Sequence, residues 1–337
     1  MSIDGEGELV LAFKGDVMLG RLVNEMIRHM GASYVWGDTL PLIKKADLRL
    51  INLECVIAKD GAPWDKTPKM FFFRADPHAI DVLKIAGVNY VSLANNHTLD
   101  FGEEALLEML NRLDEAGIAH AGAGRNLREA SKPAVIEAGG LGVGVVSFTD
   151  NESAFAATEI SPGTNYIPIT FADKIVKRVH AVIDEARSLA DLVVFSIHWG
   201  PNMRQKPTNT FREFAHAVIE MGVDIFHGHS SHIFQGIEIY EGKVIMYDTG
   251  DFIDDYYVGP EEKNDQQLLF LVMVSCGKIK RVEMIPVEIS MCQVNIAKGD
   301  VHKEISERMI KLSEEFGTAV KKKNGRLVVD VECYDAS

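Results

Sequence analysis

Cysteine is scarce in this sequence and widely spaced. The 337 residues include four cysteines, Cys55, Cys276, Cys292 and Cys333, which are too few and too far apart for a disulfide framework or a zinc knuckle. Long hydrophobic runs are also missing. The strongest apolar stretches, residues 142–148 and 268–274, have the length of strands, whereas a membrane-spanning helix needs about 20 apolar residues. Residues 1–6 form no cationic segment, so we expect no signal peptide and a soluble, cytoplasmic protein.

Basic residues are outnumbered by acidic ones. The chain has 35 Lys and Arg against 49 Asp and Glu, a formal net charge of −14. A protein that binds a phosphate backbone needs dense Lys and Arg to displace counterions, so nucleic acid is excluded as the main partner. The remaining composition, 47% hydrophobic and 25% charged, is ordinary for a globular protein of one large or two modest domains.

Short strand-like runs alternate with longer segments of helical periodicity. The strand-like runs are residues 9–13, 48–53, 90–93, 143–148, 192–197 and 224–226. The helical segments are residues 76–87, 100–117, 171–189 and 209–221. Asp100 stands three residues before Glu103, a spacing that indicates a helix cap. This alternation predicts an α/β protein whose helices cover its sheets.

The pattern changes to consecutive strands between residues 233 and 286. We expect antiparallel pairing among residues 236–240, 244–247, 268–274 and 279–285. A helix is predicted over residues 302–316 and a strand over residues 326–331. No linker-like composition separates these parts, so residues 1–290 are expected to form one domain. Residues 291–337 should add a helix and a strand that pack on the same domain.

Polar clusters stand where the predicted strands end. They are Gly15-Asp16, Asn52-Leu53-Glu54, Asn95-Asn96-His97, His198-Trp199-Gly200 and the segment 227–232 (HGHSSH). In open α/β sheets, ligands bind outside the carboxyl ends of the strands. We therefore expect five separate segments to bring side chains into one crevice.

The side chains in these clusters are carboxylates, amides and imidazoles, which together suit Zn, Fe or Mn. They exceed what one tetrahedral ion needs, so the sequence predicts two divalent ions about 3.5–4 Å apart. Each residue alone has a plainer interpretation. Asp16 fits a helix cap, Asn95 and Asn96 fit a turn, and His198 fits a buried core histidine. The metal hypothesis rests on their joint placement.

The order of these motifs resembles that of the CapA family, the poly-γ-glutamate capsule synthesis proteins related to calcineurin-like metallophosphatases. The resemblance covers residues 9–252. It is carried by the segment 15–21 (GDVMLGR), Asn52-Leu53-Glu54, Phe73-Arg74-Ala75, the segment 94–97 (ANNH) with Asp100 and Gly102, His198-Trp199-Gly200, and the segment 228–232 with Gln235. It implies a four-layer α/β/β/α sandwich with mixed sheets and a metallophosphatase-type site.

The resemblance also implies a role for each site residue. Two of them, Asp16 and His232, would hold one metal ion, and Glu54 would bridge to the second. The second ion would be held by Asn96, His198 and His229.

Further groups would act on the substrate. His97 would protonate the leaving group, because an imidazole titrates near neutral pH. Arg21 would clamp an anionic oxygen during catalysis, and Arg74, Asn95 and Lys69 would bind substrate. A surface salt bridge is the plainer interpretation of both arginines.

Some positions depart from the related patterns. Met18 stands where the related phosphatases carry a histidine, and Glu54 replaces their bridging aspartate. Ser230-Ser231 replaces a His-Pro pair of the CapA pattern. Asp251 replaces an asparagine, either as an extra oxygen ligand or as a turn residue.

Two classes of function follow. The first is a CapA-type hydrolase that uses a metal-activated hydroxide on a phosphoester or γ-glutamyl amide bond of a small or polymeric anionic substrate. The second is a non-catalytic accessory protein of poly-γ-glutamate synthesis or export that binds the polymer or its synthase. With a net charge of −14, a polymer-binding protein would need a local basic strip. Its candidates are Lys66, Lys69, Arg74, Arg204 and Lys206. A folded protein whose site has decayed is a third interpretation.

Overall fold

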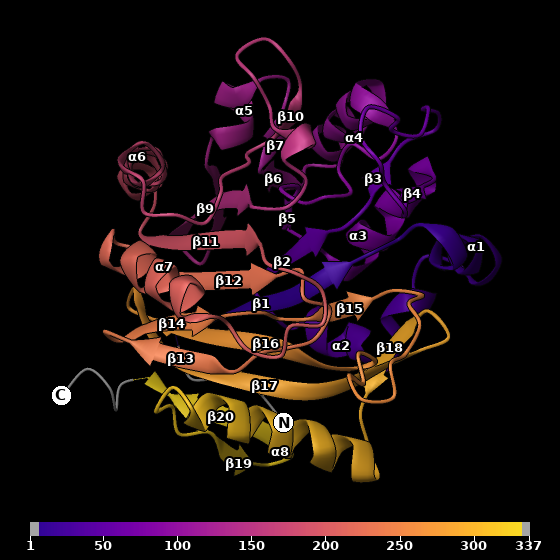
Figure 1. Ribbon diagram of the computed structural model, residues 1–337. Coiled ribbons are helices and arrows are strands. Elements are labelled where there is room, and N and C mark those ends of the chain that lie inside the picture. Colours follow the sequence, from indigo (N-terminus) through magenta and orange to yellow (C-terminus); the bar gives the residue numbers. More distant parts are fainter. Residues whose placement is uncertain (1–6, 332–337) are drawn as a thin grey trace.

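The computed structural model describes residues 7–331 and contains two β-sheets packed face to face, with helices on both outer faces (Figure 1). Residues 1–6, which bear on the signal-peptide prediction, and residues 332–337 with Cys333 lie outside the described residues. Cys55, Cys276 and Cys292 are free thiols. The predicted four-layer α/β/β/α sandwich is confirmed by this arrangement.

The larger sheet is built around β1 (Glu8–Val17). Its order is β19-β20-β17-β16-β1-β2-β5-β6, with β15 paired to β1 and β18 paired to β17. The bounds of the other strands are β2 (Leu48–Leu53), β5 (Tyr90–Ser92), β6 (Ala119–Ala121), β15 (Asp251–Ile253), β16 (Gln266–Ser275), β17 (Lys278–Ser290), β18 (Gln293–Ile296), β19 (Lys321–Lys323) and β20 (Arg326–Asp330). Strands β1, β2, β5 and β6 run parallel, whereas β16 runs antiparallel to β1.

The smaller sheet has the order β13-β14-β12-β11-β9-β8. Its strands are β8 (Ala134–Ala138), β9 (Leu141–Thr149), β11 (Leu192–His198), β12 (Ile225–His229), β13 (Ile237–Tyr240) and β14 (Lys243–Met246). The expected antiparallel pairing is found for β13 with β14 and for β16 with β17, but β14 runs parallel to β12 and belongs to the other sheet from β16. Two small pairs join β3 (Val56–Ile57) to β4 (Arg74–Ala75) and β7 (Ala123–Gly124) to β10 (Gly163–Thr164).

Three hydrophobic clusters separate the layers. One contains buried residues of β1 and β2 together with helices α1 (Arg21–Met30), α2 (Leu40–Ile43), α3 (Ile80–Ala86) and α4 (Gly102–Glu115). A second lies between the two sheets and includes Phe13, Phe270 and Val194. The third joins the outer face of the smaller sheet to α6 (Asp173–Leu189) and α7 (Asn209–Glu220). Helix α5 (Leu127–Ser131) is short and contacts β7.

The C-terminal segment continues the larger sheet. Strand β20 pairs antiparallel with β17 over Arg281↔Asp330 to Met284↔Leu327. Helix α8 (Gly299–Glu314) contacts β13, β16 and β17, and its Ile305, Met309 and Leu312 enter the cluster between the sheets. Figure 1 shows α8, β19 and β20 together beside β17.

Gly15 allows β1 and β15 to approach closely just before Asp16. A Cβ atom on Gly15 would lie 1.7 Å from the carbonyl oxygen of Gly250, the same oxygen that accepts a hydrogen bond from the Asp16 amide at 2.9 Å. Because the backbone must shift, Gly15→Ala is expected to lower the free energy of unfolding by about 1–3 kcal/mol, measured by denaturant titration. Gly142→Ala on β9 is the control, since its Cβ would meet nothing nearer than 3.5 Å. An equal loss in both variants would contradict this explanation.

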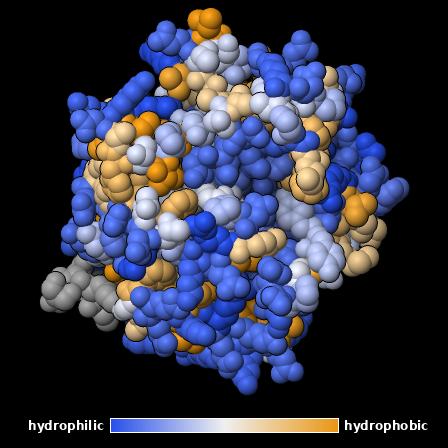
Figure 2. Space-filling model, viewed as in Figure 1, coloured by the Kyte–Doolittle hydropathy of each residue, from blue (hydrophilic) through white to orange (hydrophobic). Residues whose placement is uncertain are grey.

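The surface is mostly polar on the face that Figure 2 presents. Hydrophilic residues cover most of that view, and hydrophobic residues form small patches between them. No helix in residues 7–331 combines the length and the hydrophobicity that a membrane crossing requires.

Candidate metal centre

The predicted ligands meet at the carboxyl ends of parallel strands. Figure 1 shows the arrowheads of β1, β11 and β12 pointing to the same side of the molecule. There, Asp16 Oδ1 at the end of β1 lies 3.7 Å from His198 Nδ1 and 3.5 Å from His229 Nδ1. Its other oxygen, Oδ2, lies 3.6 Å from His232 Nδ1. The sandwich therefore brings residues that are far apart in the sequence into one cluster.

Two groups of potential ligands share Asp16. The first is Asp16, His198 and His229, and the second is Asp16, Glu54, His232 and Asp251; within each group the ligand atoms lie within 4.8 Å of one another. Asp16 is thus common to both groups, because β1 contacts β12 across the sandwich. Glu54, which follows the neighbouring strand β2, also approaches the first group, since its Oε1 lies 3.9 Å from His198 Nε2. The bridging role expected for Glu54 stays a prediction. Asp251 enters because β15 pairs with β1 in the register Asp16↔Asp251.

Buried oxygen atoms in this cluster lack hydrogen-bond partners. They are Asp16 Oδ2, Glu54 Oε1 and Asp251 Oδ2. Burial raises the pKa of Glu54 well above its usual value, and the nearby Asp16 and Asp251 carboxylates add to the effect. Unsatisfied buried carboxylates are costly, and a cation that they coordinate removes that cost. The residues present therefore fit a divalent metal ion, with imidazoles and carboxylates as donors.

Asn52 and Asn95 form a buried chain of hydrogen bonds behind Asp16. Asn52 Nδ2 donates to Asp16 Oδ1 at 2.7 Å. Asn95 Nδ2 donates to Asn52 Oδ1 at 3.1 Å and to the Leu53 carbonyl at 2.9 Å, while its Oδ1 accepts from the His97 amide and the Thr98 hydroxyl. These bonds use both donors of Asn95 and at least one acceptor position, because the Thr98 hydroxyl shares its single proton with the Leu93 carbonyl. Asn95 is fully buried and therefore supports Asp16 through Asn52, and its expected contact with substrate stays a prediction.

The loop after β12 is strained and tied down. Ser230 and His232 have positive φ angles of 114° and 61°, which non-glycine residues adopt at a cost. Asp248 holds this loop, because its Oδ2 accepts from the Ser231 amide at 2.9 Å and its Oδ1 from the Gly250 amide at 2.8 Å. This loop conformation places His232 Nδ1 2.9 Å from Asp251 Oδ1. The Ser230-Ser231 pair, which departs from the CapA pattern, thus lies in a loop that still brings His232 into the cluster.

His97 is held beside the cluster by Asp100. His97 Nδ1 lies 2.6 Å from Asp100 Oδ2, and its ring stacks on Phe73 with centroids 3.9 Å apart. Its Nε2 lies 3.9 Å from Glu54 Oε1. Lys69 Nζ pairs with Asp100 Oδ1 at 3.2 Å and donates to the Asn96 carbonyl at 2.6 Å. Burial lowers the pKa of His97 well below its usual value and raises the pKa of Asp100 to about 7.

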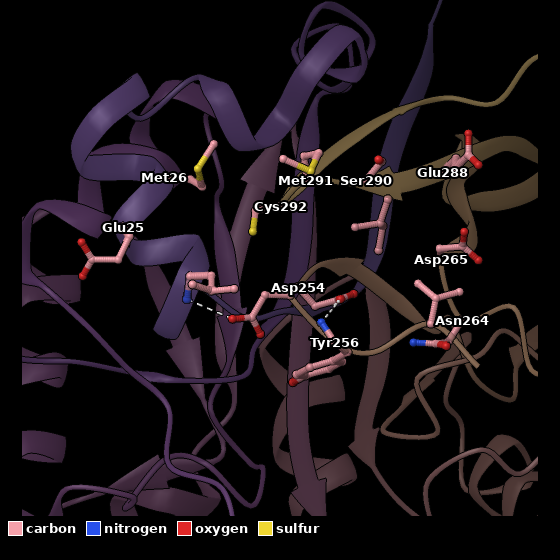
Figure 3. Close-up of a pocket in the computed structure, with 14 residues that line it drawn as sticks. Glu25, Met26, Asp254, Tyr256, Asn264, Asp265, Glu288, Ser290, Met291 and Cys292 are labelled. Carbon is pink, nitrogen blue, oxygen red and sulfur yellow. Dashed lines mark hydrogen bonds between the residues drawn. The ribbon is translucent and has the colours of Figure 1, made fainter. Parts of the chain in front are cut away.

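Tyr256 stands between two cavities. Its hydroxyl donates to Glu54 Oε2 at 2.8 Å, and its amide donates to Asp254 Oδ1 at 2.8 Å. On the side away from the cluster lies a pocket of about 440 Å³ whose lining includes Met26, Met291 and Cys292. Figure 3 shows Asp254 and Tyr256 in this pocket, with carboxylates on both sides of it. Tyr256 thus fixes one oxygen of Glu54 and leaves Oε1 to the cluster.

A cleft of about 580 Å³ opens over the cluster, and Asn96, His97, His232 and Tyr256 contribute to its lining. Arg21 and Lys69 also line it. Arg21 Nη2 pairs with Asp255 Oδ1 at 3.2 Å, and the guanidinium lies 5.5 Å from the Phe73 ring centre.

Arg74 and Met18 lie away from this cleft. The Arg74 guanidinium lies over the Phe101 ring at 4.7 Å, and Arg74 is not among the described residues that line the cleft. Met18, in the position of a phosphatase histidine, is buried in the core, and its sulfur accepts from the Gly20 amide.

Sequence reasoning missed several residues of the site. Asp100 was expected to cap a helix, but α4 begins at Gly102 after the N-cap Phe101, and Asp100 orients His97 instead. Asn52 stood in one of the predicted polar clusters but was given no role, and the register Asp16↔Asn52 is what places it against Asp16. Tyr256 had none, since nothing in its neighbourhood in the sequence distinguishes it from the adjacent Tyr257.

Comparisons with known proteins agree with the motif order. The family model described as "Bacterial capsule synthesis protein PGA_cap" matches residues 10–256. A probable polyglutamine synthesis accessory protein of Mycobacterium tuberculosis is 30% identical, over 91% of this chain and 91% of its own length. The capsule biosynthesis protein CapA of Bacillus anthracis is 30% identical over 74% of this chain and 60% of its own. The PGA biosynthesis protein CapA of Bacillus subtilis is 28% identical over 97% and 83%. Among solved structures, a hypothetical protein from Thermus thermophilus aligns over 84% of this chain and 100% of its own with a TM-score of 0.49 and 15% identity.

Proposed function

Because the chain belongs to the bacterial capsule synthesis protein family PGA_cap, we propose that it is a metal-dependent hydrolase of poly-γ-glutamate metabolism. Its target is a phosphoester or a γ-glutamyl amide bond in a small or polymeric anionic substrate. The observation that carries this proposal is the pair of ligand groups that share Asp16 and contain buried oxygens without hydrogen-bond partners. A structural role alone gives no reason to bury so many carboxylates in one place.

Two divalent ions are proposed, and their donors suit Mn, Zn or Fe. One ion would be held by Asp16, His198 and His229, and the other by Asp16, Glu54, His232 and Asp251. Asn96 Oδ1 is an additional available oxygen. When bound, such ions lower the pKa of water and polarise the scissile group.

The protein's own groups complete the chemistry. His97 would deliver a proton to the leaving group from Nε2, the ring nitrogen that faces Glu54. Because burial lowers the pKa of His97 and Asp100 lies against Nδ1, the ring must first take up a proton at Nε2, so this step is expected to be faster at lower pH. Asp100 fixes the ring through Nδ1, and Lys69 holds Asp100 in place. Arg21, on the wall of the cleft, supplies positive charge to an anionic substrate oxygen.

Activity with added metal tests the proposal. Protein loaded with Mn, Zn or Fe should cleave a generic phosphodiester or a γ-glutamyl peptide, and His198→Ala should abolish that cleavage. His180→Ala, which replaces a half-exposed histidine on α6, should leave it unchanged. Metal-free protein that reacts at the same rate would contradict the proposal.

A second candidate is a non-catalytic accessory role in polymer synthesis or export. The name of the Mycobacterium tuberculosis relative, which is an accessory protein of polyglutamine synthesis, favours it. In that case the chain would bind poly-γ-glutamate without cleaving it. Binding should then be strongest at low salt, where electrostatic attraction is least screened. Failure of the polymer to bind at low salt would exclude polymer binding and leave only an accessory role that acts through the synthase.

A further inference from the structure

Three exposed apolar side chains stand at the cleft over the candidate metal centre. Met70, Phe71 and Tyr257 line that cleft and are 82%, 55% and 84% exposed. Tyr257 and Met70 are the most exposed large hydrophobic residues in positions 7–331 after Ile160, which is 91% exposed. Single exposed apolar residues need no explanation, but apolar residues gathered at a site do.

These side chains come from two separate parts of the chain. Met70 and Phe71 lie between β3 and β4, and Tyr257 follows β15. They meet at the same cleft as His97 and His232, which lie at the candidate metal centre. Two unrelated segments thus present apolar surface to the place where a substrate would lie.

The remaining lining of the cleft mixes polar groups with Pro68, Phe73 and Met203 and includes two cationic side chains. Lys69 and Arg21 contribute positive charge, while Glu152 is the acidic residue in the lining apart from the metal centre. Both cations are already paired, Lys69 with Asp100 and Arg21 with Asp255, so the anionic scissile group would be held chiefly by the metal ions of the proposed function. A substrate that is charged along its whole length would leave Met70, Phe71 and Tyr257 in water, whereas an apolar substituent would bury them.

We propose that the substrate carries a compact apolar substituent, such as an aryl group, next to its anionic scissile group, and that Met70, Phe71 and Tyr257 select for it. The inference rests on the proposed function and narrows its substrate class. The three residues determine specificity and take no part in bond cleavage. They lie at the mouth of the cleft, so their effect should fall on binding.

Two phosphonates that resist hydrolysis test this by calorimetric titration of the metal-loaded protein. Phenylphosphonate should bind at least about tenfold more tightly than methylphosphonate, the smallest factor typical for a lost apolar contact in a site. In the double variant Met70→Ser, Tyr257→Ser, the ratio should fall towards one while the affinity for methylphosphonate stays the same. The constant methylphosphonate affinity shows that the variant is folded. Ile160→Ser, the same kind of change at an exposed position that does not line the cleft, should preserve the ratio.

The failures of the two proposals are distinguishable. The proposal of an apolar substituent would be overturned if the two phosphonates bound with equal affinity, or if the double variant left their affinity ratio unchanged. The proposed function would survive either result, because it is supported separately by metal-dependent cleavage. If metal is bound and neither phosphonate binds, the apolar substituent is overturned together with the phosphoester form of the proposed function, whereas metal-dependent cleavage of a γ-glutamyl peptide would still support the hydrolase.

Discussion

Replacing Asp16 by asparagine is expected to empty both metal sites and to lower hydrolytic activity by about 10³-fold or more. Asp16 belongs to both ligand groups, so its loss removes a carboxylate from each ion. A metal ion contributes several kcal/mol of transition-state stabilisation, and about 4 kcal/mol corresponds to a factor of 10³. Elemental analysis of the purified variant after metal addition, together with its rate on the best substrate, checks the prediction.

Two further measurements make this test specific. His198→Ala removes a ligand from one group only, so it should keep about one ion where Asp16→Asn keeps none. Metal addition should raise the thermal unfolding midpoint of the unmodified protein, because a ligand that binds the native state stabilises it, and should not raise that of Asp16→Asn. Two bound ions in Asp16→Asn would refute the shared role of Asp16.

The fold class and the gathering of possible metal ligands could be predicted from the sequence because they depend on local patterns. Strand β2 was predicted with its observed bounds, and the polar clusters that follow β1, β2, β5, β11 and β12 did converge. The resemblance to the CapA family is confirmed by the match over residues 10–256. Convergence could be inferred because parallel strands present their carboxyl ends at one edge.

What could not be predicted depends on pairing between distant strands. The shared position of Asp16 follows from the contact of β1 with β12, and the entry of Asp251 follows from the pairing of β15 with β1. Neither contact has a signal in the local sequence. Asp100 was misinterpreted for a different reason. Its spacing to Glu103 fits a capping box, but its carboxylate is already occupied by His97 and the Phe73 amide, so the helix begins two residues later.

His97→Asn is expected to lower activity in a way that depends on the leaving group. A general acid contributes about 10²–10⁴-fold when the leaving group must be protonated. Amine or alkyl alcohol leaving groups should therefore show a loss of this size in kcat, whereas a p-nitrophenolate leaving group, which departs unprotonated, should show little loss. The metal content should stay unchanged, because His97 belongs to neither ligand group. Rates on a matched pair of alkyl and p-nitrophenyl substrates, with elemental analysis, provide the measurement.

Asp100→Asn tests whether the orientation of the His97 ring matters for catalysis, because the ring itself is kept. This variant keeps the imidazole but replaces the carboxylate that lies 2.6 Å from its Nδ1, so the ring loses the partner that fixes its tautomer. The variant should show the same leaving-group dependence as His97→Asn, with a smaller loss of kcat. Replacing Lys69, which pairs with Asp100, should also lower kcat with that leaving-group dependence. A loss that is equal for both leaving groups would mean that His97 and Asp100 act on binding or folding. In that case the proton must come from another group, and Tyr256, which lines the cleft and whose hydroxyl donates to Glu54, is an alternative donor.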